Sequence, residues 1–471
     1  METLSGLDAK FLYSETPTAH MHTIKVAVSD VSEVESGFSF AVMTEVLGQL
    51  LVRLPPFRRR VVPVPLGLGH PVWVEDPEFD LARHVSRFVL DPPGDDRALA
   101  VAVAAFAGTA LPRDRPLWAL QVVEGVAGGR IAVVVKLHHA VADGSAAVAL
   151  LKNAVEAATV APHPAPPADP WVPEPLPTRS RLVTRALAEQ VTRVRGLPHL
   201  VRASVSSVRA SEHKRHSFEP MPPIPLHHIP KTSFNVSLDS ARTFAMTRLP
   251  LPLMREIRRA TGTTLNDVYL TVCAGALRAY LSRHGGIPGR PLVASVPVST
   301  DADAARLSGN RVDNIYVSIG TDIADPAVRL ARIHDGVRAS KEVRSLLGHD
   351  LLEQRADVVP PQLYRPTVRL WSRSHAANVL HPPLNVILSN VAGPREPIRI
   401  GPVVLEALYS VGPILEGIGC NITAWSYGDD LGVSVIGCPS SLPDPWALVD
   451  HLHDALGDLE TAVTGGVPID R

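Results

Sequence analysis

The sequence is poor in cysteine and has no long apolar run, and both shortages restrict where the protein can work. Its three cysteines, Cys273, Cys420 and Cys438, form no C-x-x-C pair, which argues against a disulfide framework and suits a reducing cytoplasm. A membrane-spanning helix needs about 18 consecutive apolar residues, and no uninterrupted apolar stretch of the sequence is that long. The first residues also lack the charged and then apolar regions of a signal peptide. We therefore expect a cytoplasmic protein that has neither a membrane-spanning helix nor a signal peptide.

The sequence also lacks an excess of charge of either sign. Its 46 Lys and Arg residues balance 47 Asp and Glu residues, so the net charge is −1 and the isoelectric point is near 7.0. No global field would attract nucleic acid, and we expect no nucleic-acid partner. Metal-ligand spacing is absent as well, because the adjacent His138 and His139 are not a two-ligand arrangement on a helix. We expect no metal site and no bound cofactor.

Length and composition predict an α/β protein with two lobes. A chain of 471 residues is too long for one core, and its 45% apolar content is that of a globular protein. We place an N-terminal lobe at 1–158, a crossover linker at 159–232 and a C-terminal lobe at 233–471. The linker opens with eight prolines in 160–178, which exclude a helix or central strand. Basic helical material with a break at Gly196–Pro198 follows in 179–216.

The spacing of apolar residues predicts strands and helices in both lobes. In the N-terminal lobe we expect strands at Thr23–Val28, Leu117–Glu124 and Ile131–Leu137, and helices at Phe38–Leu51, Asp96–Gly108 and 144–157. In the C-terminal lobe we expect strands at Thr243–Thr247, Pro291–Ser299, Val312–Thr321, Pro383–Leu388 and Leu431–Gly437, and helices at 251–261, Leu265–Arg283, 326–343, 361–380 and Trp446–Thr464. Residues 431–464 form a weak internal repeat, or echo, of the order strand 131–137, loop and helix 144–157. The repeat has no histidine at its turn, so we expect one active site per chain.

The most informative string is HHAVADG at 138–144, between a buried strand and a helix. A histidine with an ordinary pKa of roughly 6.5 can take and return a proton near neutral pH. Acyl transfer to a hydroxyl or thiol needs such a base. The structural alternative is a buried histidine pair with Asp143 as a helix N-cap. The whole string in its strand-to-helix context favours the catalytic interpretation.

The string H-H-x-x-x-D-G is the signature of the coenzyme A-dependent acyltransferase superfamily, and further motifs narrow the resemblance. In order, the chain contains LSGLDAKFLYSE (4–15), FRRR (57–60), WVEDPEFDLARHV (73–85), LPRDRPLW (111–118), TTLNDVYL (263–270), SVPVS (295–299), Gly309-Asn310, SNVAGP (389–394) and NITAWSYGDDLGVSV (421–435). Together they resemble the bacterial wax ester synthase/diacylglycerol acyltransferase family, particularly its actinobacterial triacylglycerol synthases. The resemblance implies two chloramphenicol-acetyltransferase-like lobes, with mixed sheets flanked by helices and an active-site channel between them.

The resemblance also implies roles for individual residues. His139 is the expected general base, His138 orients the site, and Asp143 supports the loop through an arginine that the sequence cannot name. Gly144 would allow close packing or an unusual backbone angle. The expected substrate-binding residues are Gly144, Asn266, Asp267, Ser295, Ser299, Asn310, Ser389 and Asn390. Asn266-Asp267 has a capping alternative, because it opens a long helix. No G-x-S-x-G elbow is present, which weighs against a covalent acyl-enzyme.

The expected reaction moves a long-chain acyl group from acyl-CoA, as co-substrate, to diacylglycerol or a long-chain alcohol. Alternatives are an acyltransferase for a polyketide or glycolipid, and a catalytically weak lipid-binding protein of the same fold. We expect a monomer that associates peripherally with a membrane or lipid droplet, with the basic segment 179–216 as one candidate contact. The chain departs from the family's usual pattern at 19–23, at 233–238 and at Asp301. These departures leave the acceptor and the acyl pocket open.

Overall fold

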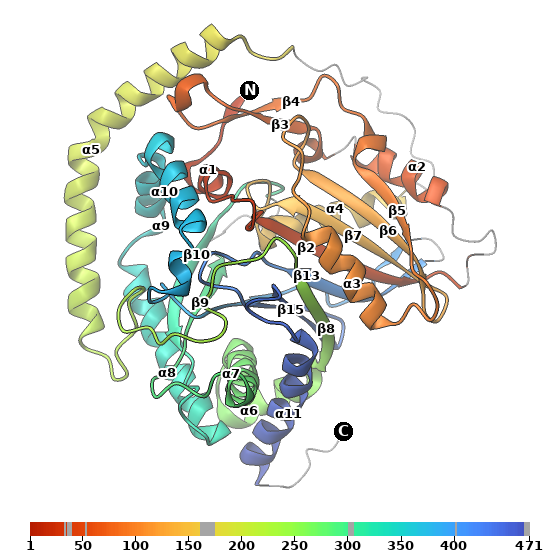
Figure 1. The fold of residues 1–471 in the computed structure, drawn as a ribbon, viewed down its shortest axis with the longest axis vertical. Coiled ribbons are helices and arrows are strands. Elements are labelled where there is room, and N and C mark those ends of the chain that lie inside the picture. Colours follow the sequence, from red (N-terminus) through yellow and green to blue (C-terminus); the bar gives the residue numbers. More distant parts are fainter. Residues whose placement is uncertain are drawn as a thin grey trace.

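The computed structural model describes residues 1–32, 34, 40–51, 54–160, 175–299, 306–400 and 403–465. Within these residues the chain forms two six-stranded mixed sheets and a small three-stranded sheet, flanked by helices (Figure 1). The expected α/β architecture is therefore present. Most of the proline-rich stretch 160–178, and Asp301, lie outside the described residues.

The first sheet has the strand order β12-β13-β2-β7-β6-β5. Its strands are β2 (His22–Asp30), β5 (Val85–Val89), β6 (Trp118–Val126), β7 (Arg130–His138), β12 (Arg399–Ile400) and β13 (Val403–Val411). Alternate residues of β7 point to opposite faces, as in any strand. Ala132 and Val134 pack with helix α3 (Asp96–Ala107), whereas Leu137 packs with helix α4 (Gly144–Val160). Strands β12 and β13 come from the C-terminal part of the chain, so the two halves of the sequence share this sheet.

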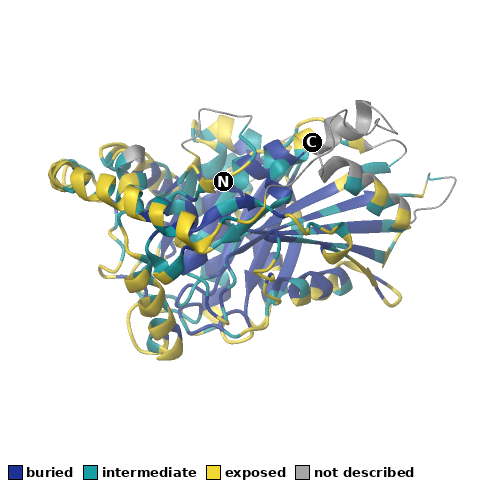
Figure 2. Cartoon of the chain, turned by 90° about the horizontal axis from the view of Figure 1, so that it is seen from above, coloured by how far each residue is buried: buried dark blue, intermediate teal, exposed yellow. Residues whose placement is uncertain are grey.

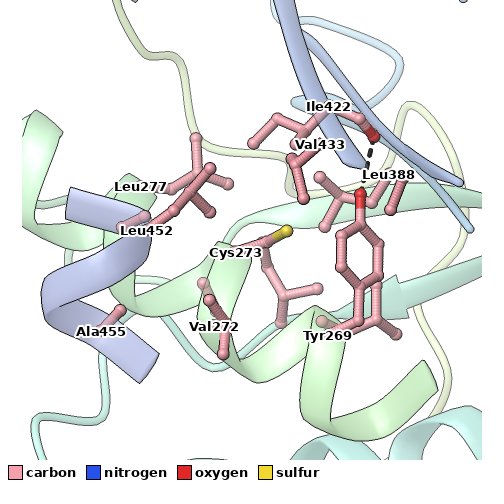
Figure 3. Packing of buried hydrophobic residues seen from close by; sticks show 14 of the residues in the cluster. Tyr269, Val272, Cys273, Leu277, Leu388, Ile422, Val433, Leu452 and Ala455 are labelled. Atoms are coloured by element: carbon pink, nitrogen blue, oxygen red, sulfur yellow. Dashed lines mark hydrogen bonds between the residues drawn. The ribbon is translucent and has the colours of Figure 1, made fainter. Parts of the chain in front are cut away.

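The second sheet has the order β10-β9-β11-β14-β15-β8. Its strands are β8 (Thr243–Pro250), β9 (Val293–Ser299), β10 (Val312–Ser318), β11 (Val386–Val391), β14 (Asn421–Tyr427) and β15 (Asp430–Gly437). Helices α6 (Leu251–Thr261), α7 (Leu265–Arg283), α8 (Pro326–Ser345) and α11 (Pro445–Thr464) bury one face. Figure 3 shows this core, in which Tyr269 and Cys273 of α7 lie against β14 and β15. On the other face, Trp425 of β14 packs on Leu408 of β13 and joins the lobes.

The remaining elements surround the first lobe and the junction. They are β1 (Glu2–Thr3), α1 (Gly6–Tyr13), α2 (Phe40–Leu51), β3 (Arg59–Val62), β4 (Val72–Glu75), α5 (Arg179–Arg215), α9 (His349–Asp357) and α10 (Pro361–Arg373). Strands β3, β4, β5, β12, β13 and β14 and helix α9 were not anticipated, because they are short or lack a clear apolar period. The echo is present: β15, a turn and α11 repeat the order of β7, its loop and α4.

Two helix predictions were wrong. The break expected at Gly196–Pro198 does not occur, and α5 continues through Pro198. A proline inside a helix removes the hydrogen bond to the carbonyl four residues earlier. Here that residue is Val194, which is 61% exposed, so water can solvate the freed carbonyl. The helix expected at 361–380 ends at Arg373, because His375 adopts a left-handed backbone with φ 50°.

A prediction about the hydrophobic core of the second lobe concerns the Tyr269 hydroxyl. This hydroxyl donates a 2.9 Å hydrogen bond to the Ile422 carbonyl (Figure 3). Tyr269→Phe leaves that buried acceptor without its partner, so we expect the free energy of unfolding to fall by about 1 kcal/mol. Tyr280→Phe is the matched control. Tyr280 lies on the same helix and is equally buried, but its hydroxyl has no hydrogen-bond partner among the described residues. Urea unfolding of both variants should show the larger loss for Tyr269→Phe; equal losses would contradict this assignment.

Candidate active site

The HHAVADG loop lies where the two lobes meet. It follows β7 and runs beside the start of β2, where His139 N donates to the Met21 carbonyl at 2.8 Å. The segment 306–311 of the second lobe covers it from the other side. Gly309 N donates to the Val141 carbonyl at 2.8 Å, and Asp143 N donates to the Gly309 carbonyl at 3.3 Å. The backbone of the motif is therefore held by both lobes.

Of the two ring nitrogens of His139, one makes a hydrogen bond with the described residues and the other makes none. Its Nδ1 lies 2.9 Å from Asn310 Oδ1. The Asn310 amide nitrogen donates to Asp8 Oδ1 and to the His139 carbonyl, both at 2.7 Å. Since this fixes the orientation of the amide, Oδ1 must accept a hydrogen bond and Nδ1 must carry the proton. Nε2 keeps its lone pair and makes no hydrogen bond with the described residues.

The surroundings of His139 favour the neutral imidazole. Burial lowers the pKa of His139, the hydrogen bond that His139 donates to Asn310 and the charge of Asp143 oppose the shift, and the charge of Lys25 adds to it. Phe11 stacks on the ring with centroids 4.1 Å apart and planes 11° apart. His139 as a residue is of intermediate exposure. A neutral, oriented imidazole whose Nε2 keeps its lone pair can accept a proton from a hydroxyl.

Asp143 combines the two roles that the sequence left open. Its Oδ1 accepts from Ala146 N at 2.9 Å, which caps α4. Its Oδ2 accepts from Arg311 N at 2.7 Å and lies 2.6 Å from Arg306 Nη2. Asp143 is 1% exposed, so the guanidinium compensates a buried charge. Arg306 is the partner that the sequence could not name.

His138 points away from this network. It is fully buried, its Nδ1 accepts from Ala140 N at 3.0 Å, and its Nε2 lies 2.9 Å from Glu15 Oε1. Burial, together with the charge of Arg113, holds the pKa of His138 well below its ordinary value. A neutral histidine fixed in this way can hold the shape of the strand end, which agrees with an orienting role.

Four further predicted residues lie at or near the start of α4. A Cβ on Gly144 would lie 3.1 Å from Val391 Cγ2, so glycine allows close packing, and its backbone is not in the left-handed region. Val391 follows Ser389 and Asn390 on β11, which places that motif beside the loop. Ser145 Oγ donates to Ser299 Oγ at 3.2 Å.

Asn266, Asp267 and Ser295 make different contacts. Asp267 forms a capping box with Thr264 and lies 2.8 Å from His334 Nδ1, all within the second lobe. Ser295 Oγ donates to Asn314 Oδ1 at 3.2 Å. Within the described ranges, no hydrogen bond or ion pair joins these residues to the 138–144 loop. The capping alternative is present, and a substrate-binding role for them stays a prediction.

Sequence reasoning missed the contribution of α1. Asp8 and Phe11 reach the His139 network, and Glu15, just after the helix, lies against His138. Their spacing of three and four residues would place them on one helical face, which was the available signal. Arg306 carried no such signal, because it lies far from Asp143 in the sequence.

The described part of the chain offers no exposed cysteine and no metal-binding cluster. All three cysteines are buried, and burial raises the pKa of the Cys273 thiol to about 12. The described residues hold no group of three or more His, Cys, Asp or Glu side chains arranged for a metal ion. Activity without a metal or cofactor stays a prediction.

Comparison with known proteins points to one family. Two proteins of Mycobacterium tuberculosis H37Rv, both provisionally named diacylglycerol O-acyltransferases, are similar to the chain. The first is 38% identical, and the match covers 94% of this chain and 93% of the relative. The second is 33% identical, and the match covers 98% of this chain and 90% of the relative. The solved wax ester synthase/diacylglycerol acyltransferase from Marinobacter aquaeolei VT8 is 26% identical with a TM-score of 0.66, covering 98% of this chain and all of its own.

A more distant structure shares the fold alone. The first condensation domain of the CDA synthetase has a TM-score of 0.59 at 17% identity, covering 99% of this chain and 97% of its own. Family models match two parts of the chain, and the first match extends past β8 and α6 of the second lobe into α7. Residues 4–269 match the wax ester synthase/diacylglycerol acyltransferase catalytic domain, and residues 308–460 match the family's C-terminal domain. With its HHAVADG loop, its two-lobed fold and these matches, the chain belongs to the wax ester synthase/diacylglycerol acyltransferase family.

Proposed function

We propose that this protein is an acyl-CoA-dependent O-acyltransferase that moves a long-chain acyl group to diacylglycerol, and also to long-chain alcohols. The observation that carries the proposal is His139, whose Nδ1 is held by Asn310 while Nε2 keeps its lone pair. The substrate classes come from the family and from the names of the mycobacterial relatives.

In the proposed mechanism, His139 Nε2 takes the proton of the acceptor hydroxyl as its oxygen attacks the thioester carbonyl of acyl-CoA. The carbon–sulfur bond then breaks, and the thiolate of CoA takes the proton back from the imidazolium. The products are an ester and free CoA, and the base is regenerated. Direct attack of this kind needs no covalent acyl-enzyme and no metal.

Asp143 is assigned a supporting role in this mechanism. Both of its carboxylate oxygens are already engaged, by the α4 backbone, by Arg306 and by the backbone of Arg311. A buried group engaged in this way fixes the loop that carries His139. His138 likewise orients the strand end.

Two alternatives differ in acceptor or in class. Acceptance of another alcohol, such as a polyketide or glycolipid, is the alternative that the departures at 19–23, near the loop, leave open. His22 is buried beside Met21, whose carbonyl binds His139 N. A lipid-binding protein without turnover would keep the fold but have no need of an oriented imidazole. Product analysis with several acceptors and one acyl-CoA separates these functions.

We also propose that α5 rests on a membrane or lipid-droplet surface. No helix in the described ranges is long and apolar enough to cross a membrane. Instead, α5 lies along one side of the molecule with most of its surface in solvent (Figures 1 and 2). Its outward apolar side chains are between 44% and 61% exposed: Leu187, Val191, Val194, Val201, Val205 and Val208.

Helix α5 has apolar side chains on its outward face as well as on the face that packs on the protein. Buried Leu182, Ala186, Leu200 and Ser211 face the protein, whereas the valine stripe faces outward. Exposed Arg195, Arg202 and Arg209 recur every seven residues beside the stripe. An apolar stripe flanked by cations suits the boundary of an anionic lipid layer. Arg193 is different, because it pairs with Glu189 and is only 24% exposed.

The first prediction concerns the base. His139→Ala should lower the rate of ester formation by a factor of about 10²–10⁴, because it removes the only proton acceptor that the mechanism uses. Radiolabelled acyl-CoA with diacylglycerol measures the rate, and the thermal midpoint should stay close to that of the parent. His453→Ala, an exposed histidine on the second lobe, is the control and should retain full activity. A folded His139→Ala protein with normal turnover would rule out this mechanism.

The second prediction concerns pH. A base acts in its unprotonated form, so a lowered pKa moves the acid side of the activity profile to lower pH. Because burial lowers the pKa of His139, the midpoint of the fall in kcat/KM on the acid side should lie below the ordinary histidine value of about 6.5. Lys25→Met removes a neighbouring positive charge and should move the fall toward higher pH. An acid side centred above pH 6.5 in the parent would contradict the assignment.

The third prediction concerns α5. Replacing Arg195, Arg202 and Arg209 by Gln should reduce flotation with anionic vesicles at low salt, where the Debye length is about 10 Å, and have little effect at 1 M salt, where it is about 3 Å. Replacing Val191, Val201 and Val205 by Ser should reduce flotation at both. Exchange of Arg258, Arg283 and Arg332 by Gln is the control. Unchanged flotation of both α5 variants would assign membrane contact to another surface.

A further inference from the structure

A carboxylate from the N-terminal helix lies behind His139. Asp8 is in the first turn of α1 and is 7% exposed. Its Oδ1 accepts from Asn310 Nδ2 at 2.7 Å. Its Oδ2 lies 3.5 Å from the point where a Cβ on Gly309 would stand, and Gly309 has a left-handed φ of 80°. The Gly309-Asn310 turn is thus shaped around this carboxylate.

A buried carboxylate is costly unless its lone pairs and charge are used. Burial raises the pKa of Asp8 to about 6, while hydrogen bonds from Asn310 and Ser5 and the charge of Arg306 oppose that rise. Asp8 is therefore ionised at neutral pH in a place that disfavours charge. The geometry indicates what it is used for, because its partner Asn310 is the residue that holds the imidazole of His139.

We propose that Asp8 is a positioning residue which, through Asn310, fixes the tautomer and orientation of His139. This inference rests on the proposed function of His139 as general base. The amide nitrogen of Asn310 has two acceptors, Asp8 Oδ1 and the His139 carbonyl, so its oxygen is left to accept from His139 Nδ1. A carboxylate can only accept hydrogen bonds, and it therefore holds the amide in this one orientation.

The consequence for the base follows from the two possible orientations of the amide. If the Asn310 side chain turned over, its NH₂ group would face His139 Nδ1 and select the tautomer with the proton on Nε2. That tautomer cannot take a proton from a hydroxyl. Asp8 acts against it without touching the substrate, as the third group of a nucleophile–base–orienter arrangement does elsewhere.

Asp8 also has a helical role that must be separated from this one. Ser5 caps α1 by accepting from Asp8 N at 3.1 Å, so a change at Asp8 can loosen the helix. Ser5→Ala removes that cap, and with it the hydrogen bond from Ser5 to the Asp8 carboxylate, but it leaves the Asp8–Asn310 contact in place. It therefore controls for losses that do not pass through Asn310.

The kinetic test uses the full chain with Asp8→Ala, Asp8→Asn and Ser5→Ala. We expect Asp8→Ala to lower kcat by roughly 10- to 100-fold, the usual scale for groups that orient a functional residue, with the KM for acyl-CoA unchanged. Asp8→Asn keeps an acceptor oxygen at the same place and should recover most of kcat. Ser5→Ala should lower the thermal midpoint without changing kcat. Losses of kcat that follow the thermal midpoints of all three variants would overturn the proposal.

The second measurement does not depend on turnover. Nitrogen-15 NMR of labelled histidine reports which ring nitrogen carries the proton. The parent should show His139, identified by its loss in His139→Ala, with the proton on Nδ1, and Asp8→Ala should show a mixture of tautomers. If ester formation is absent for every acceptor but the tautomers shift as expected, the proposed function fails and this inference stands. If the tautomer of Asp8→Ala matches the parent, the inference fails whatever the activity.

Discussion

The active site of this protein depends on the contacts between two loops from different lobes. The HHAVADG loop contributes Asp143 and His139, and the segment 306–311 contributes Arg306 and Asn310. Its ion pair is almost completely buried, with side-chain exposures of 14% for Arg306 and none for Asp143. Removing one partner of such a pair leaves an uncompensated charge, so each lobe depends on the other. The reactive histidine is fixed only when the lobes are joined.

The sheets reinforce this dependence. Strand β13 adds to the first sheet antiparallel to β2, yet its residues come from the chain segment between β11 and β14 of the second sheet. On the other side, Trp425 of β14 packs with Leu408 of β13 in a shared apolar cluster. The junction therefore has both backbone hydrogen bonds and a hydrophobic contact. An active site built at such a junction is held by rigid elements on both sides, which suits a base whose orientation matters.

Helix α5 is the part of the molecule least explained by its own packing. It places small and polar residues such as Ser204 and Ser207 toward Arg355 of α9, and it leaves its valines in water. Exposed apolar stripes of this length are unusual on a monomer unless something covers them. The proposed contact with a lipid layer gives the stripe a partner. It would also bring the enzyme to acceptors that dissolve in lipid, although the chain carries no net positive charge.

The sequence by itself determined the local features of this protein. The apolar period predicted α7 with its bounds, and the apolar run before HHAVADG predicted β7 and the start of α4. Such features depend on neighbours a few residues apart, which a sequence displays directly. The family resemblance supplied the fold and the reaction. It also implied that Asp143 supports the loop by pairing with an arginine, without identifying that arginine.

Only the tertiary structure decided which distant residues complete the site. Arg306 as the partner of Asp143, Asp8 behind Asn310, and β13 inside the first sheet all join segments more than a hundred residues apart. The continuity of α5 through Pro198 and the outward direction of its valines were also decided there. The physical reason is common to these cases. Long-range pairs form where the packing of the whole chain places them, and no local period records that choice.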